Sequence, residues 1–202
     1  MFLIIEEEIF EYKNNINEIN NIILKINKKV EEGDNYFSHL IVDGKEVYEN
    51  HDSYLLENIN GISEIRVICK SVSELTNDIL LSTEKYINSA VPEIKLLAEE
   101  FYNTPTDLTW KKYDQLLEGL QWITHMIVSV DRLKHNIRNW NEYLQIVSSV
   151  DEELNHISDA LEHKDYVLIA DIIQYEIMDM LEKLKVRISM TIDSVGIREN
   201  LL

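Results

Sequence analysis

Glycine and proline are scarce in this chain, and their scarcity limits the folds it can adopt. The 202 residues include 5 glycines and 2 prolines. With so few turn-forming residues, long helices joined by short connections are expected. Apolar residues make up 45% and charged residues 28% of the chain, which is typical of a folded globular protein. The length allows one large domain or two small ones.

Helical periodicity dominates the sequence from residue 72 onward, where apolar residues recur at spacings of three and four. The first helix is expected from Val72 to Phe101, with Pro92 inside it. Because proline lacks an N–H and its ring clashes with the preceding turn, it should kink this helix or split it in two. The second helix is expected to begin after Thr104 as N-cap, with Pro105 at its first position.

Two further helices follow. Asn139 with Glu142 resembles a capping box at the start of the third helix. Asp165 is the expected cap of the fourth helix, and Gly196 is its expected C-terminal stop. Four amphipathic helices with short connections predict an antiparallel bundle over residues 72–202.

The first seventy residues carry strand signals instead. Asp43-Gly44 indicates a two-residue type I′ hairpin, which needs positive φ at both positions. Apolar residues at helical spacing from Ile16 to Val30 predict one helix. Strands are predicted from the short apolar runs at residues 1–5, 9–12, 39–42, 46–48 and 65–69. We therefore predict an α+β chain, with a small sheet domain over residues 1–70 followed by the helical bundle.

The order of these elements resembles a known fold. Two strands, a helix, two strands and a last strand, with the hairpin Leu40-Ile41-Val42-Asp43-Gly44-Lys45-Glu46-Val47, are similar to the β-grasp fold of ubiquitin. Ubiquitin-like modifiers end in a flexible Gly-Gly tail, whereas Lys70-Ser71-Val72-Ser73 runs directly into a helical pattern. The resemblance therefore implies no conjugation chemistry. It implies a docking module or a unit that only packs on the bundle.

The bundle also resembles known proteins. The segment from Leu161 to Glu176, which includes Lys164-Asp165-Tyr166-Val167-Leu168, is similar to a recurrent pattern in an uncharacterised bacterial helical-bundle family with no known activity. In size and helix count, the bundle is similar to flagellar and secretion export chaperones.

Charge and cysteine content exclude several classes of function. The formal net charge is −18, so phosphate backbones and anionic lipid surfaces should repel the chain. We expect neither nucleic-acid binding nor membrane binding. The apolar run Met1–Ile5 is too short for a signal-peptide core or a membrane span, so the expected compartment is the cytoplasm. The single cysteine, Cys69, lies in an apolar run and is expected to be a buried, inert thiol.

The sequence contains little that suggests an active site. No two glycines lie within ten residues of each other, so a phosphate-binding glycine loop is not expected. Glu153 and His156 have the Glu-x-x-His spacing of di-iron four-helix proteins, which need two such motifs and two further glutamates. One copy is present, and the helical periodicity turns His156 away from the core. We predict no catalytic residue, metal or cofactor, with Glu153 and His156 as the metal-ligand candidates to test.

Surplus apolar residues instead suggest a binding surface. The fourth helix is apolar nearly all round between Tyr166 and Leu181, so it should be either central in the fold or an interface. Trp122 lies off the apolar seam of the second helix, which suits an interface anchor or a core residue. The predicted partner-binding residues are Trp122, Ile172, Tyr175 and Met178.

We therefore predict a non-enzymatic interaction or adaptor protein with a protein partner. Two alternatives remain open: an export or assembly chaperone that holds a helical or disordered client, and a metal-binding helical-bundle enzyme. A homodimer through the fourth helix is compatible with all three.

Overall fold

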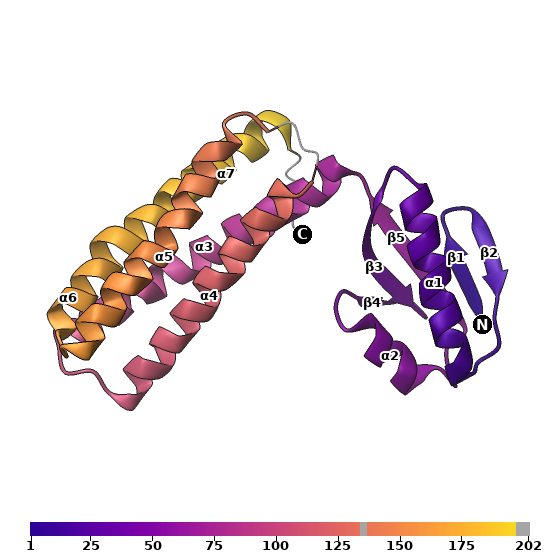
Figure 1. Cartoon of the computed structure of the whole chain (residues 1–202), viewed down its shortest axis with the longest axis horizontal. Helices are drawn as coiled ribbons and strands as arrows, with labels where there is room; N and C mark the ends of the chain where they lie inside the picture. Colours follow the sequence, from indigo (N-terminus) through magenta and orange to yellow (C-terminus); the bar gives the residue numbers. More distant parts are fainter. Residues whose placement is uncertain (134–136, 197–202) are drawn as a thin grey trace. The chain divides into compact units, whose positions relative to one another are not determined.

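The chain forms two compact units, a small sheet unit followed by a helical unit (Figure 1). The structure is a computed structural model that describes residues 1–133 and 137–196. The units comprise Met1–Leu75 and Thr76–Leu202. All five strands of the described residues lie in the first unit, and long helices make up the second. The predicted α+β class is confirmed. Residues 134–136 and 197–202 of the predicted bundle lie outside the described part.

The first unit contains a mixed five-stranded sheet. Its strand order is β2-β1-β5-β3-β4, with β1 and β5 parallel and the other neighbours antiparallel. Its helices are α1 (Ile16–Glu32) and α2 (His51–Asn58). The strands are β1 (Phe2–Ile5), β2 (Glu8–Glu11), β3 (Tyr36–Val42), β4 (Lys45–Val47) and β5 (Glu64–Lys70). The polar stretch around Leu55, for which the sequence allows a loop or a short helical turn, is the short helix α2, and Leu55 is buried in the core of this unit.

Asp43 and Gly44 form the predicted hairpin between β3 and β4. Both have positive φ, 48° and 83°, as a type I′ turn requires. The Asp43 carboxylate also accepts hydrogen bonds from the backbone N–H groups of Ser63 and Glu64, at 2.8–3.1 Å. One side chain therefore ties the hairpin to the start of β5.

One face of the sheet is covered by helices. Ile19, Ile22 and Ile26 of α1 pack at helical spacing against inward-facing strand residues such as Leu3 and Ile65, which are fully buried. The Asn15 side chain caps α1 by accepting from the Asn17 N–H, and Gly33 is its C-cap.

The second unit is an antiparallel bundle of four long helices (Figure 1). The first three are α3 (Val72–Tyr102), α4 (Asp107–Asp131) and α5 (Trp140–Glu162). Helix α3 continues through Pro92, so it is not split there. The fourth helix is a continuous run of α6 (Tyr166–Asp171), a π-helical segment η1 (Ile172–Ile177) and α7 (Met178–Val195).

One predicted N-cap, Thr104, is wrong, and Asn139 is the N-cap of α5 but without the predicted capping box. Helix α4 begins after Thr106, not Thr104, because the Thr106 hydroxyl accepts from the Thr109 N–H while the Thr109 hydroxyl accepts from the Thr106 N–H. Asn139 precedes α5 in a left-handed conformation and its side chain makes no capping hydrogen bond. Asp165 does cap α6, accepting from the Leu168 N–H at 3.0 Å.

The π-helical segment explains why apolar residues occur on nearly all sides of the fourth helix in the sequence. A π turn holds an extra residue, so it shifts the buried face of the residues that follow it. Ile169, which precedes this segment, and Ile173, which lies within it, are fully buried. Ile177 at its end and Leu184 beyond it are also buried. The helix keeps its contact with the core over its full length by this change of phase.

Candidate docking surfaces

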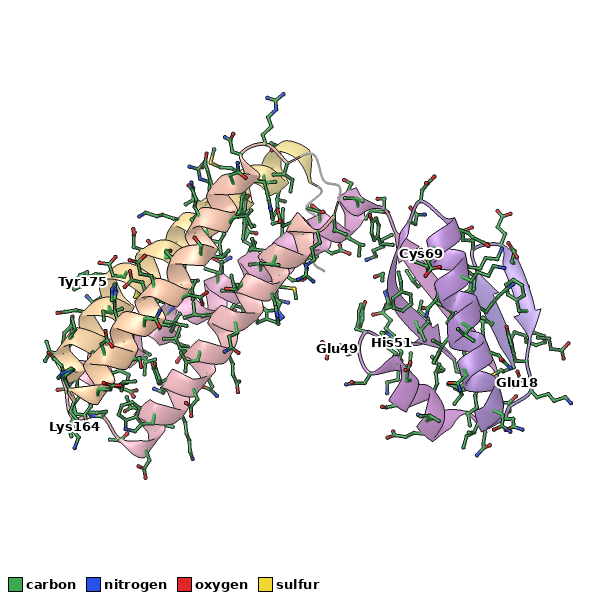
Figure 2. The ribbon with its side chains drawn as sticks, in the orientation of Figure 1. Glu18, Glu49, His51, Cys69, Lys164 and Tyr175 are labelled. Atoms are coloured by element: carbon green, nitrogen blue, oxygen red, sulfur yellow. The ribbon has the colours of Figure 1, made fainter. Side chains whose placement is uncertain are left out.

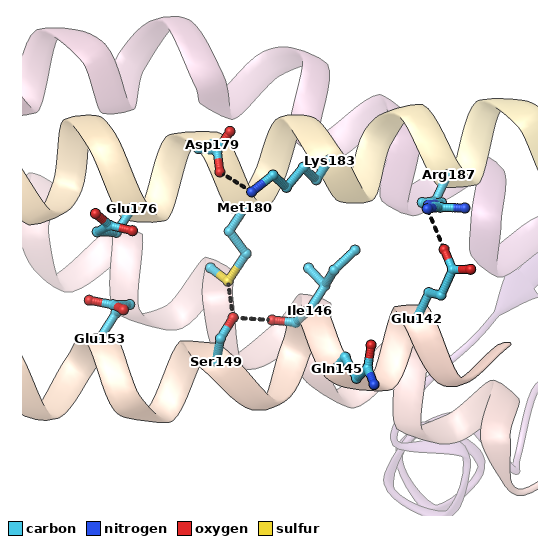
Figure 3. Close-up of a pocket in the computed structure, with 10 residues that line it drawn as sticks. All are labelled: Glu142, Gln145, Ile146, Ser149, Glu153, Glu176, Asp179, Met180, Lys183 and Arg187. Carbon is cyan, nitrogen blue, oxygen red and sulfur yellow. Dashed lines mark hydrogen bonds and ion pairs between the residues drawn. The ribbon is translucent and has the colours of Figure 1, made fainter. Parts of the chain in front are cut away.

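A groove runs between α5 and the η1–α7 part of the fourth helix (Figure 3). Its volume is about 720 Å³. The residues that face into it recur at spacings of three and four along each helix, as helical geometry requires. The α5 wall consists of Glu142, Gln145, Ile146, Ser149 and Glu153. The opposite wall consists of Glu176, Asp179, Met180, Lys183 and Arg187.

Ion pairs lie at one end and in the middle of this groove. Arg187 pairs with Glu142 across the groove, and Lys183 pairs with Asp179 on its own helix (Figure 3). In the middle, the Ser149 hydroxyl donates to the Ile146 carbonyl at 2.7 Å and contacts the Met180 sulfur at 3.3 Å. Both basic side chains of the groove are therefore already paired with carboxylates.

Two carboxylates face each other at the other end. Glu153 on α5 and Glu176 on η1 point toward one another from opposite walls (Figure 3). His156 Nδ1 lies 3.1 Å from Glu153 Oε2, and this hydrogen bond raises the pKa of His156. The His156 side chain is 53% exposed and lies on the outside of the bundle.

Glu153 and His156 are the predicted metal-ligand candidates. Within residues 1–133 and 137–196, no group of three or more His, Cys, Asp or Glu side chains is placed to hold a metal ion. The pair forms a partly exposed charge interaction, and a di-iron site of the kind that uses this spacing would need further ligands that the described residues do not bring together.

The predicted partner-binding residues differ in their surroundings. Tyr175 is 60% exposed and points outward from η1 (Figure 2). Ile172 is buried in the bundle core, and Met178 is half-buried against that core. Trp122 is also half-buried, with its ring centroid 5.2 Å from that of Tyr86 on α3. Tyr175 is the one of these four that presents most of its side chain to a partner.

Sequence reasoning missed other exposed apolar residues on the same helix. We use the name fourth-helix surface for the large apolar side chains there that are more than half exposed. These are Val167, Tyr175, Val186 and Met190, at 56%, 60%, 57% and 61%. The signal was present in the sequence, but without the phase change at η1 the outward positions cannot be assigned.

The sheet unit also has an open face. Residues 1–75 are all described, and α1 and α2 both pack on the covered face of their sheet. On the opposite face, Ile4 pairs with Ile9 on β2 and with Arg66 on β5, and Arg66 pairs with Ile41 on β3. Ile9 is 65% and Phe2 is 49% exposed. An apolar row with one central arginine therefore crosses four strands.

Cys69 is the one cysteine of the chain. It is partly buried at the end of β5 (Figure 2), and burial raises the pKa of its thiol, with the Glu6 carboxylate adding to this effect. A raised pKa keeps the sulfur protonated and so disfavours its use as a nucleophile.

None of the helices in the described residues combines the length and the apolar character that crossing a bilayer requires.

Comparison with known proteins gives one match, in the helical unit. Residues 78–187 match a family described as "Domain of unknown function (DUF8042)". This range covers α4, α5, η1 and both walls of the groove, together with most of α3. No curated protein and no solved structure matches the chain. The match covers more than half of the 202 residues, so the chain belongs to the DUF8042 family.

Proposed function

We propose that the protein is a non-enzymatic interaction protein that binds a protein partner through its helical unit. The observation that carries this proposal is the fourth-helix surface. Val167, Tyr175, Val186 and Met190 are each more than half exposed on one continuous helix. Large apolar groups that recur along one surface element are typical of interaction sites, whereas single exposed ones are normal.

The N-terminal unit is proposed to be a β-grasp docking module. The strand order β2-β1-β5-β3-β4, the parallel central pair and the single long helix on one face support this assignment. The open sheet face supports a docking role, because Phe2 and Ile9 expose apolar surface there.

The charge of the chain restricts the partner. A net charge of −18 opposes association with another acidic surface and speeds association with a basic one. The same charge opposes a homodimer, since two copies would bring like charges together. We therefore propose a basic protein as partner.

A second candidate is an export or assembly chaperone. The groove between α5 and η1–α7 favours it, because a cleft between two antiparallel helices can hold a helical client. A chaperone of this kind would hold its client in the groove before the client has folded, whereas the adaptor would bind a folded partner through the fourth-helix surface.

Photo-crosslinking from the full chain tests the proposal. A photoreactive phenylalanine analogue at position 175 should give one discrete adduct in cells. The same analogue at Leu24, which is 66% exposed on α1, is the control and should give no adduct of that mass. An adduct of two chains would indicate a homodimer. Absence of any adduct from position 175 would contradict the proposal.

A further inference from the structure

We propose that the groove between α5 and η1–α7 binds a basic amphipathic helix of the partner, with a lysine or arginine of that helix placed between Glu153 and Glu176. This inference rests on the proposed function and names the chemistry of the partner segment. The groove, and not the fourth-helix surface, would then determine which partners are accepted.

The shape of the groove suits a helical segment. The α5 wall from Glu142 to Glu153 spans eleven residue-to-residue steps, as does the opposite wall from Glu176 to Arg187. At the standard rise per residue this is about 16 Å, or about three helical turns. Its volume of about 720 Å³ lies within the usual range for ligand pockets. A linear cleft of this length fits a helix that lies along the two walls.

The charges in the groove leave one position for a cation. Lys183 and Arg187 are the basic residues that line it, and they pair with Asp179 and Glu142. The pKa of Lys183 is raised first by Asp179, with Glu176 a minor cause, so Glu176 is not its main partner. Glu153 has a hydrogen bond to His156 but no lysine or arginine of the groove beside it.

A cation bound between Glu153 and Glu176 would reduce the repulsion between their carboxylates. Two carboxylates that face each other repel, and a positive group between them interacts favourably with both. Arginine suits the position through its fork of donors, and lysine suits it as a compact charge. The groove therefore has charge complementarity to a basic segment at a defined place, beyond the general acidity of the chain.

The middle of the groove supplies an apolar contact. Ile146 and Met180 lie between the paired end and the acidic end. Methionine is flexible and polarisable, so it adapts to different apolar partners. A helix bound in a groove is held by apolar anchors that recur along one of its faces at helical spacing. A basic helix with one apolar face could therefore contact Ile146 and Met180 with its apolar residues while a basic residue reaches the acidic end of the groove.

A fluorescent peptide provides the test with the full chain. The probe is a labelled amphipathic helix of leucine and lysine of about 15 residues, long enough to form a helix when bound. Binding is followed by fluorescence anisotropy at an ionic strength of about 0.15 M, where distant charges are screened. The variant Glu153→Gln/Glu176→Gln removes the two facing charges and keeps the side-chain shapes. Glu152→Gln/Glu182→Gln is the matched control, because both residues are exposed, lie on the same two helices and do not line the groove.

The two variants change the net charge equally. A difference between them therefore distinguishes binding in the groove from nonspecific electrostatic attraction to the acidic chain. We expect the groove variant to weaken probe binding by about tenfold or more, and the control to change it by less than about twofold. Ser149→Arg, which adds a cation inside the groove, should also weaken binding. Equal weakening by the two double variants, or no probe binding to the wild type, would overturn the inference. If position 175 still crosslinks to a partner in that case, the groove inference fails alone and the proposed function stands.

Discussion

The hydroxyl of Tyr86 on α3 lies directly against Gly119 on α4. A Cβ at position 119 would overlap this hydroxyl and would lie 2.8 Å from the ring carbon that bears it. The Tyr86 ring also packs against Trp122, with centroids 5.2 Å apart. Glycine at this position allows α3 and α4 to approach closely enough for this aromatic pair to pack together.

Gly119→Ala should therefore destabilise the protein although alanine favours helices. Overpacking costs about 1–3 kcal/mol, which exceeds the helix-propensity gain of about 1 kcal/mol. Urea denaturation of the full chain measures the loss. Adding Tyr86→Phe should recover part of it, because the closest atom is removed. Gly61→Ala is the control, since a Cβ there meets only an ordinary contact at 3.8 Å. Equal stability of Gly119→Ala and wild type would contradict the close contact.

The position of the α4 cap is testable with two similar threonines. Thr106→Ala removes the hydroxyl that accepts from the Thr109 N–H, so it should lower the free energy of unfolding by about 1 kcal/mol. Thr104→Ala removes a hydroxyl outside this capping box and should have a much smaller effect. A larger loss from Thr104→Ala would show that the sequence-based assignment of the cap was right after all.

The buried tyrosines should make the protein sensitive to alkaline pH. Burial raises the pKa of Tyr86, Tyr113 and Tyr143. Their contribution to stability is complete below the unfolded pKa of about 10 and is lost as pH rises through the folded pKa, because the unfolded chain ionises first. Urea midpoints measured from about pH 8 to about pH 11 should fall at the alkaline end.

Tyr143→Phe examines one of these groups. Its hydroxyl donates to the Arg187 carbonyl at 2.7 Å and contacts the Thr191 hydroxyl at 2.6 Å, so the variant should lose about 1–2 kcal/mol at neutral pH. It should also show a shallower alkaline fall than the wild type. Tyr54→Phe in the sheet unit is the control, and an unchanged alkaline fall in Tyr143→Phe would contradict the assignment.

The contact between His156 and Glu153 should be visible in a histidine titration. The Glu153 hydrogen bond is the main cause that raises the pKa of His156 above 6.5. The stabilising effect of the charged imidazole is present below the unfolded pKa and is lost as pH rises through the folded pKa. NMR titration should give a lower His156 pKa in Glu153→Gln than in the wild type. Glu152→Gln should lower it less, because Glu152 acts only through charge. Equal shifts in the two variants would rule out the hydrogen bond.

Much of the fold followed from local patterns in the sequence. The five strands, helix α1 and the Asp43-Gly44 hairpin were all predicted. Short apolar runs, helical spacing of apolar residues and a two-residue turn each have a local cause in the sequence. The four long helices followed from the same periodicity. The cap of α4 was misplaced because Thr104 and Thr106 are equivalent until the reciprocal bond with Thr109 distinguishes them.

The docking surfaces could be predicted only in part. Tyr175 was identified, but Ile172 is buried, because it lies three residues after Ile169 on the buried face. The sequence is apolar on nearly every side of this segment, so it does not distinguish core positions from surface positions there. The groove was missed for a related reason. Glu153 and Glu176 are 23 positions apart in the chain, and only the pairing of two helices places them opposite each other.

The most direct test of the central claim is quantitative affinity capture from native lysate with three forms of the full chain. These are the wild type, the variant Tyr175→Lys/Val186→Lys on the fourth-helix surface, and the variant Phe2→Lys/Ile9→Lys on the open sheet face. We expect the wild type to capture a basic protein in stoichiometric amount, the fourth-helix variant to lose it, and the sheet variant to retain at least part of it. Undiminished capture by the fourth-helix variant, or a wild-type chain that remains a monomer without any partner, would contradict this claim.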